Sequence, residues 1–194
     1  MLLAMAQLRE NDGQAGPRII TVTGLKRSGK TTVAAALIAE LKRRGFRVGS
    51  IKSTHHAALA IDLAGTDTRR HLEAGAEAVV ALAAEETVLF QRPGPCRRIE
   101  DAMRLLPPGI QYVVCEGLPS NFVPLHVVLC LLALKDYEEA IRVRGIAARS
   151  VIAISGIAAG THREAAGLGA VPVLNALDPG ELRRLADLVV DATA

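Results

Sequence analysis

The residues Arg18-Ile-Ile-Thr-Val-Thr23 lead directly into Gly24-Leu-Lys-Arg-Ser-Gly-Lys-Thr31. The first stretch is short and β-branched, as strands are. The second matches the pattern G-x-x-x-x-G-K-[ST] at every position, in the strand-to-helix setting which that pattern requires. The helix is predicted over residues 31–44, where apolar side chains recur every four positions and Gly45 ends the pattern. A strand, a glycine-rich loop and a helix in this order predict a P-loop.

The residue types of this loop predict a cradle for the phosphates of a nucleotide. Two glycines, at 24 and 29, allow the chain to wrap with its N–H groups pointing inward, and these groups and the helix N-terminus form an anion nest. Lys30 is expected to reach the β- and γ-phosphates, Thr31 to offer its hydroxyl to Mg²⁺, and Thr32 to reach the α-phosphate. The predicted ligand-binding residues of the loop are Gly24, Lys26, Arg27, Ser28, Gly29, Lys30, Thr31 and Thr32.

A carboxylate is expected beside the metal, at the end of a neighbouring strand. Glu116 follows the apolar residues 113–115 and precedes Gly117, which allows the chain to turn. It is the predicted acid that holds a Mg²⁺-bound water or orients the attacking water; the alternative is an ordinary acid at a strand end. The predicted metal-binding residues are therefore Thr31 and Glu116. A second candidate for this acid is Asp62 or Asp67, in the stretch after the second predicted strand, and the predicted catalytic residues are Lys30, Glu116 and Asp62.

The stretch 51–76 is rich in polar and titratable residues, although it lies between predicted core elements. The residues that could face the γ-phosphate and change order with the nucleotide state are His55, His56, Asp62, Asp67 and Arg70. Alternatively, the histidines are solvated and Asp67 only caps a helix predicted over 68–74. Composition alone favours the second interpretation. A zinc site formed by the three histidines of this stretch matches no standard spacing.

Strands and helices alternate along the rest of the chain, which predicts an α/β fold of three layers around a mostly parallel central sheet. Further strands are predicted at 46–51, 78–82, 87–90, 110–115, 127–132 and 150–154, and further helices at 99–106 and 135–143. The last helix has Asp178 as its cap, Pro179 at its first position and Glu181 to complete a capping box. Residues 1–17 are predicted to be a flexible leader, and residues 18–194 a single P-loop nucleotide-binding domain.

The composition excludes several classes of protein. The chain has 194 residues, 23 Lys and Arg against 20 Asp and Glu, and a mean hydropathy of +0.27. Its longest purely apolar run, 127–134, is far shorter than the roughly 20 residues that span a bilayer. The absence of Trp and the few Tyr and Phe argue against a base-stacking nucleic-acid surface. Three widely spaced cysteines form no zinc or disulfide pattern, which favours a reducing cytoplasm. Together with the short apolar run and the few aromatic residues, this predicts a cytoplasmic protein with neither a membrane nor a nucleic-acid partner.

Several short sequence motifs after the P-loop indicate which family of P-loop proteins the chain resembles. They are Lys52-x-Thr54-His55-His56, Asp62-x-x-Gly65-x-Asp67, Ala74-Gly75-Ala76 and Glu116-Gly117. In this order, and together with the P-loop, they resemble the molybdopterin-guanine dinucleotide biosynthesis protein B family over roughly residues 18–120. The resemblance implies a P-loop fold, GTP and Mg²⁺ binding with slow hydrolysis, a homodimer, and an accessory role beside the molybdopterin guanylyltransferase. It also implies that His55, Asp62 and Asp67 line a switch-like segment.

Base preference and reaction type stay open at the level of sequence. The loop expected to read the base, Ser155–Ala158, contains no acid, and the other candidate, Asn175, can both donate and accept, so it does not separate guanine from adenine. No arginine finger is evident, so hydrolysis would be weak. One alternative is a small-molecule kinase with residues 92–104 as a lid. Another is a nucleotide-dependent metallochaperone, although Cys115 and Cys130 lie in apolar strands.

Overall fold

The computed structural model describes residues 16–53, 66–91, 99–117, 125–161 and 169–194. Contacts within the chain divide it into two compact units, one formed by residues 1–53 with 98–194 and one by residues 54–97. The leader predicted over 1–17 lies outside the described residues except for its last two. The single domain predicted over 18–194 stays a prediction, because this division does not say whether the smaller unit folds by itself.

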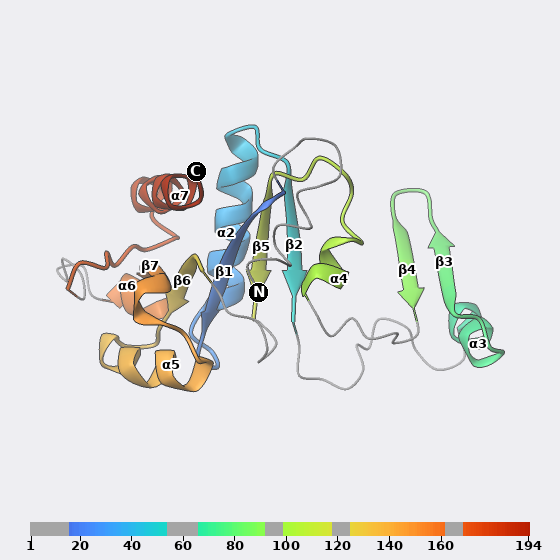
Figure 1. Cartoon of the computed structure of the whole chain (residues 1–194), viewed down its shortest axis with the longest axis horizontal. Coiled ribbons are helices and arrows are strands. Elements are labelled where there is room, and N and C mark those ends of the chain that lie inside the picture. Colours follow the sequence, from blue (N-terminus) through green and yellow to red (C-terminus); the bar gives the residue numbers. More distant parts are fainter. Residues whose placement is uncertain (1–15, 54–65, 92–98, 118–124, 162–168) are drawn as a thin grey trace. The chain divides into compact units, whose positions relative to one another are not determined.

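The larger unit is built on a five-stranded sheet in the order β2-β5-β1-β6-β7, in which every pair of neighbours is parallel (Figure 1). Its strands are β1 (Arg18–Gly24), β2 (Val48–Lys52), β5 (Tyr112–Glu116), β6 (Val127–Cys130) and β7 (Val151–Ser155). The central strands are continuous apolar runs because helices cover both faces of the sheet. The α/β fold with a mostly parallel central sheet is therefore confirmed.

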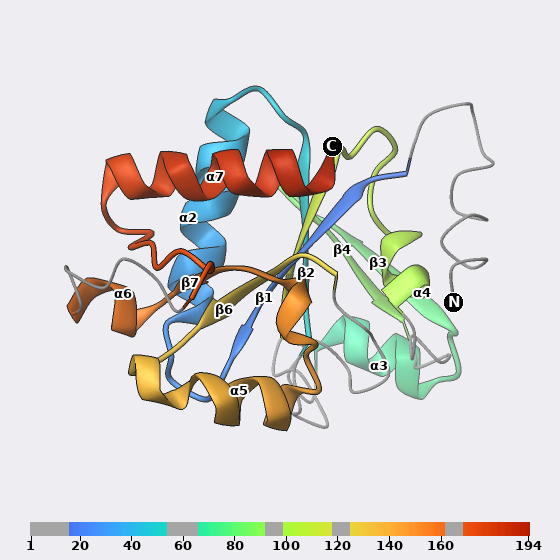
Figure 2. The ribbon, with the colours of Figure 1, turned by 60° about the vertical axis from the view of Figure 1, so that its left-hand side comes forward.

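Helices form the two outer layers. Helices α2 (Lys30–Arg43) and α7 (Pro179–Thr193) pack on one face of the sheet, and α5 (Tyr137–Arg144) covers the opposite face (Figure 2). The short helix α4 (Ile99–Met103) packs on residues of β5 that face away from α2. A one-turn helix, α6 (Ile157–Thr161), follows β7, and 3₁₀ turns at Leu134–Asp136 and Ala148–Ser150 precede α5 and β7.

The smaller unit contains α3 (Asp67–Glu73) and an antiparallel hairpin of β3 (Ala78–Leu82) and β4 (Thr87–Gln91). The hairpin pairs Val80 with Leu89 and leaves large apolar side chains in solvent. The exposed fractions of Val80, Leu82 and Leu89 are 57%, 79% and 46%. Two strands that carry apolar residues on both faces need further surface to cover them.

Most predicted elements are found with shifted ends. The predicted strand 46–51 begins only at Val48, and the predicted helix 99–106 ends at Met103. The predicted helix 135–143 begins as a 3₁₀ turn. No helix in the described part of the chain is long and apolar enough to cross a membrane.

The capping box predicted for α7 is wrong, although its cap is right. The Asp178 carboxylate accepts hydrogen bonds from the N–H groups of Gly180 and Glu181, at 2.8 and 2.9 Å. Glu181 does not return to the N–H of Asp178, because that group already donates to the carbonyl of Asn175 at 3.0 Å. Its carboxylate instead accepts from the N–H of Asn175 at 2.6 Å. The glutamate thus ties the preceding loop to the helix start.

Candidate functional site

The candidate site lies where the parallel strands of the larger unit end. Because carboxyl ends of parallel strands share one edge of a sheet, ligands bind there in α/β folds. Glu116 at the end of β5 is in register with Val22 of β1 and with Lys52 of β2. The loop after β1 and the acid after β5, which the sequence predicted separately, therefore lie at the same edge.

The loop between β1 and α2 is tightly wrapped. Gly24 has φ 154°, and a Cβ there would overlap the carbonyl oxygen of Cys130. The crest of the loop carries Arg27 at φ 63° and ends at Gly29, the N-cap residue of α2. Gly156, after β7, lies against the loop so closely that a Cβ would overlap the carbonyl oxygen of Ser28. The loop is thus fixed by backbone contacts that only glycine permits.

The side chain of Lys30 is held inside the loop. Its ammonium donates to the carbonyl oxygen of Leu25 at 2.5 Å, and the buried Ser28 hydroxyl donates to the same oxygen at 2.9 Å. Burial lowers the pKa of Lys30 from its ordinary value, and the nearby positive charge of Arg144 lowers it further. An anion in the loop would stabilise the charged form of this lysine.

Arg144 is a part of the site that sequence reasoning missed. It lies in the last turn of α5, and its Nε donates to the carbonyl oxygen of Gly24 at 2.9 Å. This contact joins residues 120 positions apart. No local pattern around Arg144 distinguishes it from Arg142, the other arginine of α5. It adds a second positive charge beside the loop and anchors the loop's first carbonyl.

Thr31 and Glu116, the two predicted metal-binding residues, are in direct contact. The hydroxyl of Thr31 donates to Oε1 of Glu116 at 2.6 Å. Oε2 of the same carboxylate lies 3.3 Å from the ammonium of Lys52. A hydroxyl and a carboxylate are the hard oxygen donors that Mg²⁺ prefers, so the residues present fit this ion. Lys52, which the sequence presented only within a family motif, is a further cation at this edge.

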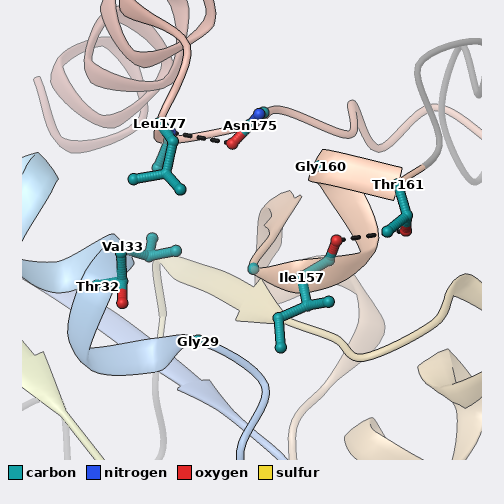
Figure 3. Close-up of a pocket in the computed structure, with 10 residues that line it drawn as sticks. Gly29, Thr32, Val33, Ile157, Gly160, Thr161, Asn175 and Leu177 are labelled. Atoms are coloured by element: carbon teal, nitrogen blue, oxygen red, sulfur yellow. Dashed lines mark hydrogen bonds between the residues drawn. The ribbon is translucent and has the colours of Figure 1, made fainter.

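A cavity of about 270 Å³ adjoins the loop (Figure 3). One wall comes from the start of α2, another from the turn and helix after β7, and the third from the loop before α7. The lining residues are Gly29, Thr32, Val33, Gly156, Ile157, Gly160, Thr161, Asn175, Ala176 and Leu177. Because Gly29 and Thr32 belong to both the cradle and the cavity, a ligand with phosphates in the loop could extend into this cavity.

Both stretches that the sequence offered for the base line this one cavity. They are the turn containing Gly156 and Ile157, and the loop containing Asn175. The side-chain oxygen of Asn175 accepts from the N–H of Leu177 at 3.0 Å. Gly160 was missed, because a glycine inside a one-turn helix has no recognisable sequence signal.

The structure describes some of the other predicted site residues. Lys26 and Arg27 are exposed at the loop crest. Asp67 belongs to the smaller unit, where its carboxylate lies 3.7 Å from Arg70. It is not the cap of α3: the Thr66 side chain accepts from the N–H of Arg69 at 3.3 Å, so that alternative is wrong. His55 and Asp62 lie outside the described residues, as does His56 of the conjectured zinc site.

The described cysteines are poor metal ligands. Burial raises the pKa of Cys115 and of Cys130 to about 12 in each case, so both thiols stay protonated near neutral pH. Among residues 16–53, 66–91, 99–117, 125–161 and 169–194, no three or more His, Cys, Asp or Glu side chains form a group that could hold a metal ion. The two cysteines are core residues, as predicted.

Comparison with known proteins gives a consistent result. Residues 19–137 match the family model described as molybdopterin guanine dinucleotide synthesis protein B. A Haemophilus influenzae protein described as a molybdopterin-guanine dinucleotide biosynthesis adapter protein is 39% identical over 108 residues, which are 55% of this chain and 60% of that protein. The match therefore spans less than two thirds of that relative's length.

Solved structures agree with the fold. Bacillus subtilis MobB has a TM-score of 0.66 at 22% identity, covering 91% of this chain and 98% of that one. A MobB homologue from Bacillus stearothermophilus has a TM-score of 0.59 at 24% identity, covering 89% and 98% of the two chains. At these identities the likeness shows a shared fold.

Proposed function

This chain belongs to the molybdopterin guanine dinucleotide synthesis protein B family, and from that premise we propose that it binds GTP with Mg²⁺ and hydrolyses it slowly. In this role it assists the guanylyltransferase that attaches GMP to molybdopterin, and it works in the cytoplasm as a homodimer. The family acts in molybdopterin guanine dinucleotide synthesis. The nucleotide, the metal, the hydrolysis and the partner are the content of the proposal.

The observation that carries the proposal is the juxtaposition of a wrapped loop and a cavity. The loop holds Lys30 and Thr31 beside Glu116, and the cavity begins at Gly29 and Thr32. Triphosphate oxygens in the loop would meet the backbone N–H groups, the start of α2 and the Lys30 ammonium. The nucleoside would then enter the cavity.

Thr31 and Glu116 would hold Mg²⁺, which when bound would neutralise charge on the phosphates. Lys30 would move from the Leu25 carbonyl onto the phosphates, and Thr32 would donate to the α-phosphate. Among the residues that the structure describes, Glu116 is our candidate for the carboxylate that orients a water. Because its two oxygens already contact Thr31 and Lys52, we expect it to position a water poorly and hydrolysis to be slow.

Two observations support the proposed partners. The Haemophilus influenzae relative is described as an adapter protein of this biosynthesis, and attachment of GMP consumes a guanine nucleotide, the ligand proposed here. For the homodimer, the support is the exposed apolar surface of the hairpin β3–β4, which comprises Val80, Leu82 and Leu89. Exposed apolar patches of this kind mark interaction surfaces.

The direct test is isothermal titration with GTP and Mg²⁺ on three proteins. The wild type should bind, and Lys30→Ala should lose affinity by about 100-fold, because the charge that faces the phosphates is removed. Lys42→Ala, an exposed lysine in the last turn of the same helix, should bind as the wild type does. Equal affinity of Lys30→Ala and the wild type would overturn the proposal.

Product analysis separates this proposal from its alternatives. Free phosphate and GDP without a phosphorylated metabolite agree with slow hydrolysis. Transfer of the γ-phosphate to a small molecule would identify a kinase. The described part of the predicted kinase lid offers no support, because Arg104 is paired with Asp101 at 2.9 Å.

A further inference from the structure

Asn175 is held so firmly that the orientation of its amide is defined. Its backbone N–H donates to Glu181 at 2.6 Å, and its carbonyl accepts from Asp178 at 3.0 Å. Its side-chain oxygen accepts from the N–H of Leu177 at 3.0 Å (Figure 3). Because a backbone N–H can only donate, the atom that faces Leu177 must be the oxygen, and the other end of the amide is the NH₂ group.

The NH₂ group of Asn175 lies at the cavity. Its Nδ2 atom is 3.9 Å from the position that a Cβ on Gly160 would take, and both residues line the cavity. No hydrogen bond joins this nitrogen to another residue in the described ranges. Asn175 therefore offers two N–H donors to whatever occupies this space.

The cavity has walls suited to a flat, apolar ring. Ile157 and Leu177 line it and are 47% and 72% exposed, which is high for such large apolar side chains. Gly160 leaves its own side of the cavity open. A purine between these residues would cover apolar surface that is otherwise in water.

Purines differ at the edge that an asparagine reads. Adenine presents an acceptor at N7 and a donor at N6, which match an amide using both its NH₂ and its oxygen. Guanine presents acceptors at both N7 and O6, which match donors only. Because the side-chain oxygen of Asn175 is turned toward the N–H of Leu177, its NH₂ group is the end placed near Gly160 of the cavity, and these donors match guanine.

We infer that Asn175, through its amide held by Leu177, makes this cavity selective for 6-oxopurine nucleotides over 6-aminopurine nucleotides. The inference rests on the proposed function, because it requires the phosphates to lie in the loop. It resolves what the sequence left open, since a free asparagine suits either purine. The group recognised is O6 together with N7, and the 2-amino group of guanine is not part of the recognition.

Four nucleotides test this inference on the wild-type protein by isothermal titration with Mg²⁺. GTP and inosine triphosphate, which share O6, should bind within about threefold of each other. ATP and 2,6-diaminopurine riboside triphosphate, which carry an amino group at position 6, should bind at least about tenfold more weakly. In Asn175→Ala the difference between GTP and ATP should fall to about threefold or less.

A second variant separates the base from the phosphates. Gly160→Leu should lower the affinity for all four nucleotides, because the leucine side chain would fill the cavity and not the loop. Its affinity for inorganic tripolyphosphate should stay within about twofold of the wild-type value. Circular dichroism checks that both variants are folded.

The outcomes distinguish the proposed base preference from nucleotide binding itself. If all four nucleotides bind equally and depend on Lys30, the inference is wrong and the proposed nucleotide binding stands. A preference for ATP, or a GTP preference that Asn175→Ala retains, also overturns the inference. If neither nucleotides nor tripolyphosphate bind to the wild type, the proposed function itself fails.

Discussion

At the scale of single residues, the site depends on contacts that a local motif specifies only in part. The pattern from Gly24 to Thr31 predicts the loop, and the structure wraps it as expected. Glu116 was predicted from a strand end and touches Thr31. Lys52 and Arg144 complete the surroundings of the loop, but they come from elements distant in the sequence. A motif contains no information about such contacts, because they arise only when the sheet assembles.

Replacement of Gly24 tests the loop's backbone. In Gly24→Ala, the added Cβ would overlap the carbonyl of Cys130, and backbone rather than a flexible side chain would have to move. We expect a loss of about 1–3 kcal/mol in the free energy of unfolding, measured with urea. Gly160→Ala is the matched control, because its added Cβ meets only Asn175 at 3.9 Å. Equal stability of the two variants would contradict the close approach of β1 and β6.

Arg144 offers a test of a residue that the sequence did not indicate. Arg144→Met removes the hydrogen bond to Gly24 and a positive charge beside Lys30. Affinity for GTP, measured by titration, should fall by about tenfold. Arg142→Met removes an exposed charge from the same helix and should change the affinity little. If the two variants bind GTP alike, Arg144 has no part in the site.

At the scale of elements, the spacing of apolar residues and the positions of glycine and proline predicted most of the fold. The apolar runs of β5 and β6 predicted buried parallel strands, and the four-residue period predicted α2. The ends of helices and strands were predicted less accurately, because the last turns of helices depend on tertiary contacts. The capping box predicted for the start of α7 is absent because the Glu181 carboxylate instead accepts from the N–H of Asn175, in the preceding loop. Through this hydrogen bond, Glu181 positions Asn175, the candidate residue for reading the base.

An ionic cluster around the buried Glu40 joins α2 to α7, with Arg43 and Asp187 at its exposed rim. Glu40 accepts hydrogen bonds from Arg43 and Arg44, and Arg44 also contacts Asp187 at 2.7 Å. These bonds hold the pKa of Glu40 at about 2, below its ordinary 4.5. The lowered pKa means that the cluster stabilises the fold above pH 4.5 and loses this contribution as the pH falls toward 2.

Glu40→Gln tests this cluster. At pH 7 the variant should be less stable than the wild type by about 1–3 kcal/mol, because the arginines lose a charged acceptor. Urea unfolding between pH 7 and pH 2 should show the two stabilities converging as the pH falls. A difference that is constant across this range would mean that the Glu40 charge does not contribute.

At the scale of the whole molecule, the proposed homodimer has a defined test. Leu82→Glu places a charge on the exposed apolar surface of β3–β4. Size-exclusion chromatography with light scattering should show a dimer for the wild type and a monomer for this variant, because a buried unpaired charge disfavours association. Val143→Glu alters a 55% exposed apolar residue on α5 and should remain a dimer. A monomeric wild type, or a dimeric Leu82→Glu, would contradict the proposal.

A crystal structure of the protein grown with Mg²⁺ and a non-hydrolysable GTP analogue would test the proposed nucleotide site. The triphosphate should lie within the loop of residues 24–31, with Lys30 on the phosphates and the metal at Thr31 and Glu116. The guanine should lie in the cavity with O6 toward Asn175. Phosphates bound at any other part of the chain, with the Lys30 ammonium still on the Leu25 carbonyl, would contradict the proposed site.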